Sequence, residues 1–179
     1  NKPQLLKGFN EVTKGNGYYK ARLSTAASPK ELMAGNYMLR SISKAKNTDH
    51  VIYTMESFEQ YPDLHYATLD FKKSIRLTHG IDQQKDYLWG TAELVSWISL
   101  DGRKLEGVVY KPADFDPAKK YPMIVSFYER NSETLFNYRM PEPHRSTIDY
   151  HLYNSNGYIV FNPDIRYVAV SYTHLRAHE

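Results

Sequence analysis

Cysteine is absent from the 179-residue sequence, which excludes disulfide bonds and thiolate metal sites. Long apolar runs are absent too, because no stretch approaches the roughly 20 residues that a membrane-spanning helix needs. No charged start followed by an apolar segment resembles a signal peptide. Since the first residue is Asn1 rather than methionine, the lack of a leader leaves the compartment undetermined.

A large excess of charge of one sign is also lacking. The formal net charge is +3, and the lysines and arginines are scattered among 20 acidic residues. Without a basic stripe, we expect no nucleic-acid partner. The apolar content of 41% is sufficient for a packed core in one full domain or in parts of two.

Tyrosine, by contrast, is abundant. The 16 tyrosines, together with Phe and Trp, bring the aromatic content to 14%. This bias suits half-buried β-strands and predicts a strand-rich fold. Exposed tyrosines could form a sugar-binding platform, but aromatic residues in strand-like alternation more often pack in a core or across strands, so we favour packing.

The histidines show no motif of the His-Glu-x-x-His kind, so we expect neither zinc nor another cofactor. Three of them lie in or near strand-like segments, and two lie next to or within a candidate helix: His50, His65, His79, His144 and His151.

Short strand-like runs alternate with turn clusters in the first part of the chain, which is the pattern of a β-meander. The runs are Tyr18 to Ser24, Tyr37 to Ile42, Val51 to Met55, Leu64 to Leu69 and Ile75 to Thr78. Their spacing resembles the four-stranded blade of a β-propeller, so we expect one blade and part of another in residues 1–78. A short helix is expected over Ser28 to Met33, where Ser28, Pro29 and Glu31 are capping signals.

A polar segment, residues 79–92, is the expected linker to the next part of the chain. After it, the runs Leu94 to Leu100 and Leu105 to Tyr110 flank the dipeptide Asp101-Gly102. This pattern predicts a β-hairpin.

The remaining segments predict an α/β unit. Pro122 to Phe127 is a continuous apolar run, as expected for a strand buried on both faces. Ser146 to Asn156 can form a helix capped by Ser146, and Gly157 is placed to end it in a left-handed conformation. Tyr158 to Asn162 is the next apolar strand, so the order strand, helix, strand indicates a mixed sheet with helices on its faces.

Together these residues resemble the start of the hydrolase domain in serine peptidases of the family that includes prolyl oligopeptidase, dipeptidyl peptidase IV and acylaminoacyl peptidases. The resemblance extends from about Tyr18 to Tyr167 and is strongest between Leu94 and Tyr128. The residues at the family's spacing are a serine before Asp101-Gly102, then Leu105, Gly107, Tyr110, Pro112 and Lys120-Tyr121-Pro122. Each piece alone is common, whereas their ordered conjunction is specific.

The resemblance implies a mixed β and α/β fold. Terminal β-propeller blades (1–78) and a linker (79–92) would precede the first strands of a truncated α/β-hydrolase sheet (93–167). The implied chemistry is hydrolysis of peptide substrates through an acyl-enzyme, with a serine nucleophile, a histidine base and an aspartate that orients the histidine.

The nucleophile would stand in a Gly-x-Ser-x-Gly elbow. After Gly107, however, Gly157 is the only glycine in the sequence, so the chain contains no such elbow. We therefore expect this piece, by itself, to lack the Ser-Asp-His triad and to be inactive.

Tyr128 is the one catalytic candidate that the resemblance leaves in this chain. In the family, a tyrosine at the end of the first buried strand donates its hydroxyl to the oxyanion of the tetrahedral intermediate, and Tyr128 stands at that place. Many relatives follow this tyrosine with Gly-Gly or Ala-Gly, whereas here Glu129-Arg130-Asn131 follows, and we expect surface salt bridges from these residues. No metal or cofactor is implied, and a homo-oligomeric parent exported to the periplasm would fit the resemblance.

Asp164 and Arg166 follow a buried strand, where ligand contacts gather in α/β sheets, and we expect them to pair and to fix a loop. Residues 168–179 break the resemblance abruptly and look like an artefactual tail. An apparent triad of Asp164, Ser171 and His174 is therefore interpreted as chance.

Two other classes of protein stay open. A non-catalytic β-rich module could bind peptide or glycan through a tyrosine-rich surface, and its intact reading frame would contain no Gly-x-Ser-x-Gly elbow. An esterase could share the hydrolase core, but the β-meander in front of that core argues against it.

Overall fold

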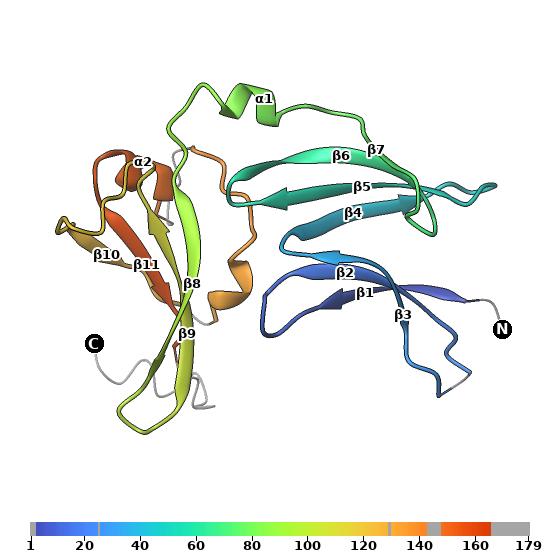
Figure 1. The fold of residues 1–179 in the computed structure, drawn as a ribbon, viewed down its shortest axis with the longest axis horizontal. Coiled ribbons are helices and arrows are strands. Elements are labelled where there is room, and N and C mark those ends of the chain that lie inside the picture. The colour runs from blue at the N-terminus through green and yellow to red at the C-terminus, as the bar shows by residue number, and fades with distance from the viewer. Residues whose placement is uncertain (1–2, 25, 129, 143–147, 166–179) are drawn as a thin grey trace, which may run out of the picture.

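The computed structural model describes residues 3–24, 26–128, 130–142 and 148–165, in which the strands form three sheets (Figure 1). The strands are β1 Gln4–Phe9, β2 Asn16–Ala21, β3 Lys30–Gly35, β4 Met38–Lys44, β5 His50–Ser57, β6 Gln60–Thr68, β7 Ser74–Arg76, β8 Thr91–Ile98, β9 Lys104–Lys111, β10 Met123–Val125 and β11 Ile159–Pro163. The helices are α1 Ile81–Gln84, the 3₁₀ helix η1 Ser132–Thr134 and α2 Tyr150–Ser155. None of the helices in this described part is long and apolar enough to cross a membrane.

The first sheet is antiparallel and has the strand order β1-β2-β3. The helix expected over Ser28 to Met33 is wrong, because most of this segment belongs to β3 and pairs with β2, with Met33 opposite Tyr18. The capping signals at Ser28 and Glu31 are local, and the longer-range pairing with β2 overrides them. Strand β1 was not predicted, although it completes this sheet.

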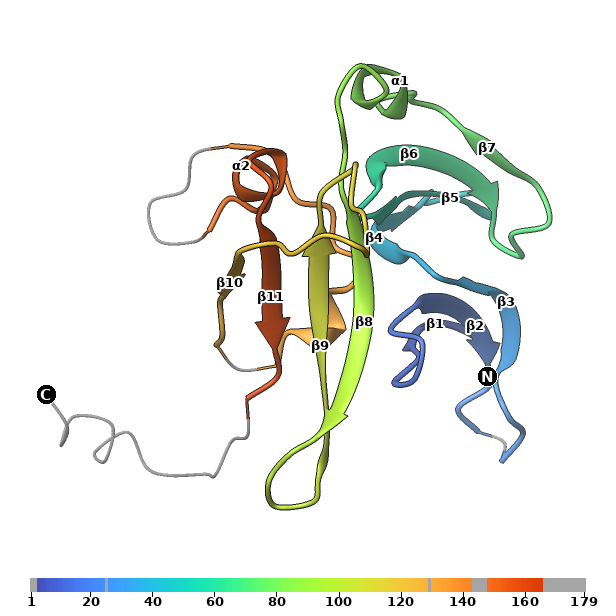
Figure 2. The ribbon, with the colours of Figure 1, turned by 60° about the vertical axis from the view of Figure 1, so that its left-hand side comes forward.

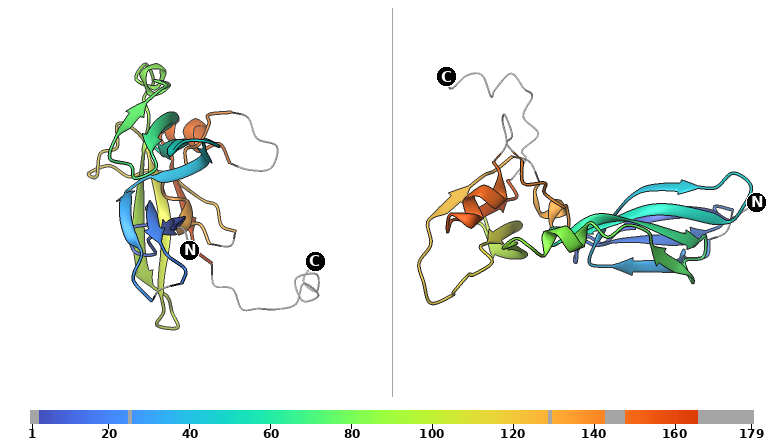
Figure 3. Two further views of the ribbon diagram at one scale, coloured as in Figure 1. Left: turned by 90° about the vertical axis from the view of Figure 1, so that its right-hand side faces the viewer. Right: turned by 90° about the horizontal axis from the view of Figure 1, so that it is seen from above.

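The second sheet, β4-β5-β6-β7, is a four-stranded antiparallel meander in which each strand pairs with the next along the chain. The predicted runs from Tyr37 to Thr78 fall on these four strands, so the β-meander is confirmed. The two antiparallel sheets lie side by side (Figures 1 and 3) and share a core of Tyr18, Leu39, Val51, Tyr53 and Ala67. The predicted packing of tyrosines is thus confirmed for Tyr18 and Tyr53, whose rings meet edge to face at 6.1 Å.

The third sheet has the order β10-β11-β9-β8, with β10 and β11 parallel and the other pairs antiparallel. The predicted hairpin is confirmed as β8 and β9, which extend well beyond the other strands of the sheet (Figure 2). Helix α2 is shorter than predicted: its N-cap is Asp149, whose carboxylate accepts hydrogen bonds from the backbone of His151 and Leu152. The predicted cap, Ser146, lies outside the described residues. Gly157 follows the helix with a φ of 77°, as predicted.

The expectation that Pro122 to Phe127 is buried on both faces is wrong for the described structure. Strand β10 covers only three of these residues, and Met123 and Val125 are 51% and 49% exposed. The physical reason is the position of β10 at the edge of the sheet, where β11 is its one paired strand among the described residues.

The first two sheets and the third sheet are joined by apolar packing as well as by the chain. Phe58, in the turn between β5 and β6, is 2% exposed and packs with Val108, Tyr110, Leu135 and Val160 of the third sheet's core. The predicted linker, residues 79–92, carries α1 and passes over the top of this junction (Figure 1).

Candidate functional site at the carboxyl ends of β10 and β11

Tyr128 follows β10, three residues beyond its last residue. The ladder with β11 continues past Val125 because the backbone N–H of Ser126 donates to the carbonyl of Phe161 (2.9 Å). The Tyr128 side chain is 72% exposed, so its hydroxyl is accessible from the surface of this chain. A dry site around that hydroxyl is not formed by the described residues.

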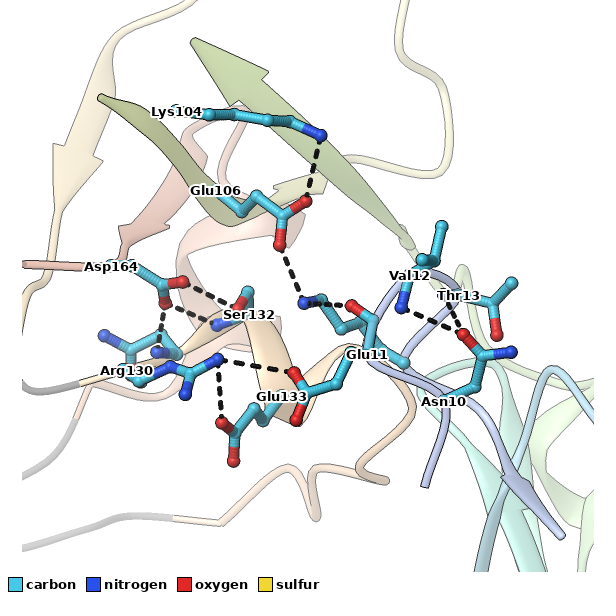
Figure 4. A network of polar contacts seen from close by, with 12 residues as sticks. Asn10, Glu11, Val12, Thr13, Lys104, Glu106, Arg130, Ser132, Glu133 and Asp164 are labelled. Carbon is cyan, nitrogen blue, oxygen red and sulfur yellow. Dashed lines mark hydrogen bonds and ion pairs between the residues drawn. The ribbon is translucent and has the colours of Figure 1, made fainter. Parts of the chain in front are cut away.

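Asp164 follows β11 directly. Because β10 and β11 are parallel, their carboxyl ends meet at one edge of the sheet, which brings Asp164 and the segment after Tyr128 together. The Asp164 carboxylate accepts hydrogen bonds from the backbone N–H groups of Asn131 (2.6 Å) and Ser132 (2.8 Å), and from the Ser132 hydroxyl (2.7 Å) (Figure 4). Asp164 itself is anchored to β9, because its backbone N–H donates to the Glu106 carbonyl (2.8 Å).

Asn131 links Tyr128 to β11. Its side-chain amide donates one hydrogen bond to the Tyr128 carbonyl (3.0 Å) and another to the Pro163 carbonyl (3.1 Å). Asn131 is the N-cap residue of η1, yet its side chain makes no capping hydrogen bond. The Asp164 carboxylate instead holds the backbone N–H groups at the start of η1, those of Asn131 and Ser132.

Arg130 makes the surface salt bridges that were predicted for this segment. Its guanidinium lies 3.1 Å from the Glu133 carboxylate and 3.6 Å from that of Glu11. The Arg130 side chain is 57% exposed, so each pair is worth little in stability. Glu129 lies outside the described residues.

The predicted pairing of Asp164 with Arg166 cannot be placed, since Arg166 lies outside the described residues. The loop that Asp164 fixes is instead the one from Asn131 to Ser132, through the three hydrogen bonds above. Ser171 and His174 of the apparent triad lie outside the described residues as well.

A buried ion pair stands next to these residues and was missed by sequence reasoning. The Lys14 ammonium lies 2.7 Å from the Glu106 carboxylate and also donates to the Glu11 carbonyl (2.7 Å) (Figure 4). The Lys14 side chain is 2% exposed and that of Glu106 is 23% exposed. The hydrogen bond from Lys14, assisted by the charge of Lys104, lowers the pKa of Glu106.

The pair joins the first sheet to the third, because Lys14 lies in the turn between β1 and β2 while Glu106 lies on β9. The one signal in the sequence is the turn chemistry of Asn10 and Gly15. The Asn10 side chain accepts from the backbone of Val12 and Thr13 and so shapes the turn. That signal locates a turn but does not identify the partner of Lys14.

An open hollow of about 370 Å³ is lined by residues of these clusters, namely Lys104, Leu105, Glu106, Arg130, Asp164 and Ile165. Its lining includes both positively and negatively charged side chains. Within the described ranges, no three His, Asp or Glu side chains are grouped closely enough to hold a metal ion.

The arrangement can donate hydrogen bonds and hold a loop, but the described residues at this edge of the third sheet do not pair a hydroxyl with a histidine. Ser132 is fully buried and its hydroxyl donates to Asp164 rather than to a histidine. His151 lies at the junction with the first part of the chain, where its Nε2 bonds the Arg139 carbonyl (2.8 Å).

Neither a family model nor a curated protein sequence matches the chain. Solved structures match in fold. The isopeptidase AtxE2, in a variant with Astexin3-dC4 bound, has 13% identity and a TM-score of 0.64 over 93% of this chain and 24% of its own.

Two further solved structures are dipeptidyl peptidases. Dipeptidyl peptidase 4 of Porphyromonas gingivalis has 16% identity and a TM-score of 0.58 over 83% of this chain and 21% of its own. A putative dipeptidyl aminopeptidase IV of Bacteroides ovatus has 21% identity and a TM-score of 0.59 over 91% and 23%. The chain spans about a quarter of the length of these proteins, and it is similar in fold to that part of each.

Proposed function

We propose that the chain is part of a larger serine peptidase of the prolyl-oligopeptidase type, and that Tyr128 donates its hydroxyl to the oxyanion of the tetrahedral intermediate. Residues 1–78 then belong to the end of a β-propeller, 79–92 to the linker, and 93–167 to the start of an α/β-hydrolase domain. The observation that carries the proposal is the place of Tyr128, at the carboxyl end of a parallel strand pair in a fold similar to that of several peptidases.

The mechanism assigns the remaining steps to segments outside this chain. A serine attacks the carbonyl of a peptide substrate, a histidine takes the proton of the serine, and an aspartate orients the histidine. Negative charge then develops on the carbonyl oxygen, and the Tyr128 hydroxyl donates a hydrogen bond to it. The Tyr128 side chain is exposed in this chain, so segments outside the chain would have to complete a water-excluded site around the hydroxyl. No metal or cofactor takes part.

The test is the variant Tyr128→Phe in the intact protein, expressed from the uninterrupted reading frame. Removal of one oxyanion donor typically costs roughly 3 kcal/mol in the barrier, so we expect kcat for a chromogenic dipeptide or oligopeptide substrate to fall about a hundredfold with little change in KM. Tyr87→Phe is the matched control, since the Tyr87 side chain is 71% exposed but lies in the segment before β8. Unchanged turnover in Tyr128→Phe would exclude the oxyanion role.

A second measurement addresses the class of protein. An intact serine peptidase reacts covalently with a fluorophosphonate probe through its activated serine. If the intact protein neither reacts with the probe nor cleaves peptides, the non-catalytic module that binds peptide or glycan becomes the better description.

A further inference from the structure

The segment after Tyr128 is fixed at three points by two side chains. The Asn131 amide joins the carbonyls of Tyr128 and Pro163, so both of its N–H groups are used. The Asp164 carboxylate holds the backbone of Asn131 and Ser132. Asn131 is the N-cap residue of η1, and its side chain makes no capping hydrogen bond there.

The geometry has a mechanical consequence for Tyr128. The side-chain amide of Asn131 binds the Tyr128 carbonyl and the Pro163 carbonyl together, and Pro163 is the last residue of β11. Asp164 is in turn tied through its own N–H to β9. The backbone of Tyr128 is therefore held, through Asn131 and Asp164, by two strands of the third sheet, β11 and β9. Its side chain remains exposed to solvent.

We propose that Asn131 and Asp164 are positioning residues that hold Tyr128 where its hydroxyl reaches the oxyanion, an inference that rests on the proposed function. Asn131 stands three positions after Tyr128 in the sequence, and its side-chain amide does the holding. Asn131 acts on Tyr128 directly through its carbonyl. Asp164 acts through Asn131.

The chemistry of the contacts predicts different outcomes for substitutions of similar shape. In Asn131→Asp the amide donors are replaced by carboxylate oxygens that face two carbonyls, so both hydrogen bonds are lost while the size is kept. In Asp164→Asn one oxygen still accepts the two backbone N–H bonds, and the hydroxyl of Ser132 can turn to accept from the new amide. Asp164→Ala removes all three acceptor contacts.

The experiment measures kcat and KM of these variants in the intact enzyme, each alone and combined with Tyr128→Phe. We expect Asn131→Asp and Asp164→Ala to lower kcat by about tenfold to a hundredfold, because a small displacement of a catalytic group is costly, and Asp164→Asn to keep most of the activity. In the Tyr128→Phe background, the same substitutions should lower kcat by no more than about twofold, since the group they position is gone. Asn156→Asp is the control, because its amide also donates to a carbonyl, that of Leu152, but on α2.

The outcomes distinguish the positioning role of Asn131 and Asp164 from the oxyanion role of Tyr128. If Tyr128→Phe is harmful but Asn131→Asp is not, or if Asn131→Asp costs the same in both backgrounds, the positioning role is overturned and the role of Tyr128 stands. If Tyr128→Phe leaves kcat unchanged, the oxyanion role of Tyr128 in the proposed function fails and the positioning role falls with it. Melting curves and size-exclusion chromatography show whether Asp164→Ala folds. If it does not fold, the result for Asn131→Asp alone decides whether the positioning role holds.

Discussion

At the scale of single residues, Lys14 shows how a charged side chain can be buried without an unpaired charge. Its backbone has a φ of 64° and its N–H donates to the Asn10 carbonyl, so a tight turn aims the side chain at β9. The ammonium there meets the Glu106 carboxylate and the Glu11 carbonyl. Glu106 retains partial exposure and a second cation, Lys104, at 3.4 Å. The two partners therefore depend on each other to different degrees.

This asymmetry yields a prediction for stability. Glu106→Gln leaves the Lys14 ammonium buried without a countercharge and should cost about 3 kcal/mol, whereas Lys14→Met leaves Glu106 near solvent and Lys104 and should cost about 1 kcal/mol. Hydrogen exchange of the amides from Asn10 to Gly15 in the intact protein measures both values. A larger loss in Lys14→Met than in Glu106→Gln would contradict this account.

At the scale of elements, Gly107 explains why the third sheet can form. Gly107 lies on β9 opposite Pro163 of β11. A Cβ atom added at Gly107 would lie 2.8 Å from the Pro163 Cα and 2.8 Å from the Asn162 carbonyl oxygen. Such contacts with backbone atoms cannot be relieved by a side-chain rotation, so the close approach of β9 and β11 requires glycine.

The corresponding prediction compares two glycines of the same hairpin. Gly107→Ala should disrupt the pairing of β9 with β11 and cost about 3 kcal/mol, in the range of overpacked cores. Gly102→Ala should cost only about 1 kcal/mol, because Gly102 has a φ of 78° but open space around it. Hydrogen exchange of β9 and β11 checks the difference, and equal exchange in the two variants would count against the steric explanation.

At the scale of the whole molecule, the two parts of the chain meet around His151. The centroid of its ring lies 4.1 Å from that of Trp89 and 5.1 Å from that of Phe58, with which it is stacked. Because Nε2 faces the carbonyl of Arg139, this nitrogen carries the hydrogen in the neutral ring. Burial lowers the pKa of His151, with smaller opposing contributions from the Arg139 carbonyl and the charge of Asp149.

Acid should therefore loosen this junction. The neutral ring is favoured in the fold, so its contribution to stability is complete above the ordinary pKa of 6.5 and is lost as the pH falls through the lowered value. We expect faster hydrogen exchange around Trp89 and α2 at pH 5 than at pH 7.5, after correction for intrinsic rates. His151→Phe keeps the ring contacts but cannot titrate, so it should lack this change. The same pH dependence in the unsubstituted protein and in His151→Phe would contradict the assignment of the acid effect to His151.

The local elements were largely predictable. The hairpin at Asp101-Gly102 and the end of α2 at Gly157 follow from turn chemistry, which involves only neighbouring residues. The segment from Ser28 to Met33 was misread because its capping signals are also local and lose to pairing with β2. The burial of β10 was misread because an apolar run does not reveal how many strands flank it.

The candidate site was predictable only in part. The resemblance indicated Tyr128, and the position after a buried strand indicated Asp164, whereas the contacts of Asn131 with Tyr128 and Pro163 appear only in the fold. Asn131 and Asp164 are 33 positions apart in the sequence, and no pattern of spacing links them.

By itself, the sequence determined that this protein is strand-rich, where its main hairpin turns, and which tyrosine ends an apolar run, because side-chain periodicity and turn preferences act over a few neighbouring residues. Only the tertiary structure decided that Lys14 is neutralised by Glu106 and that Asp164 accepts the backbone N–H groups of Asn131 and Ser132. The physical reason is that the pairing of strands brings distant side chains into contact, and a buried charge or N–H group is then satisfied by whichever partner the fold places beside it.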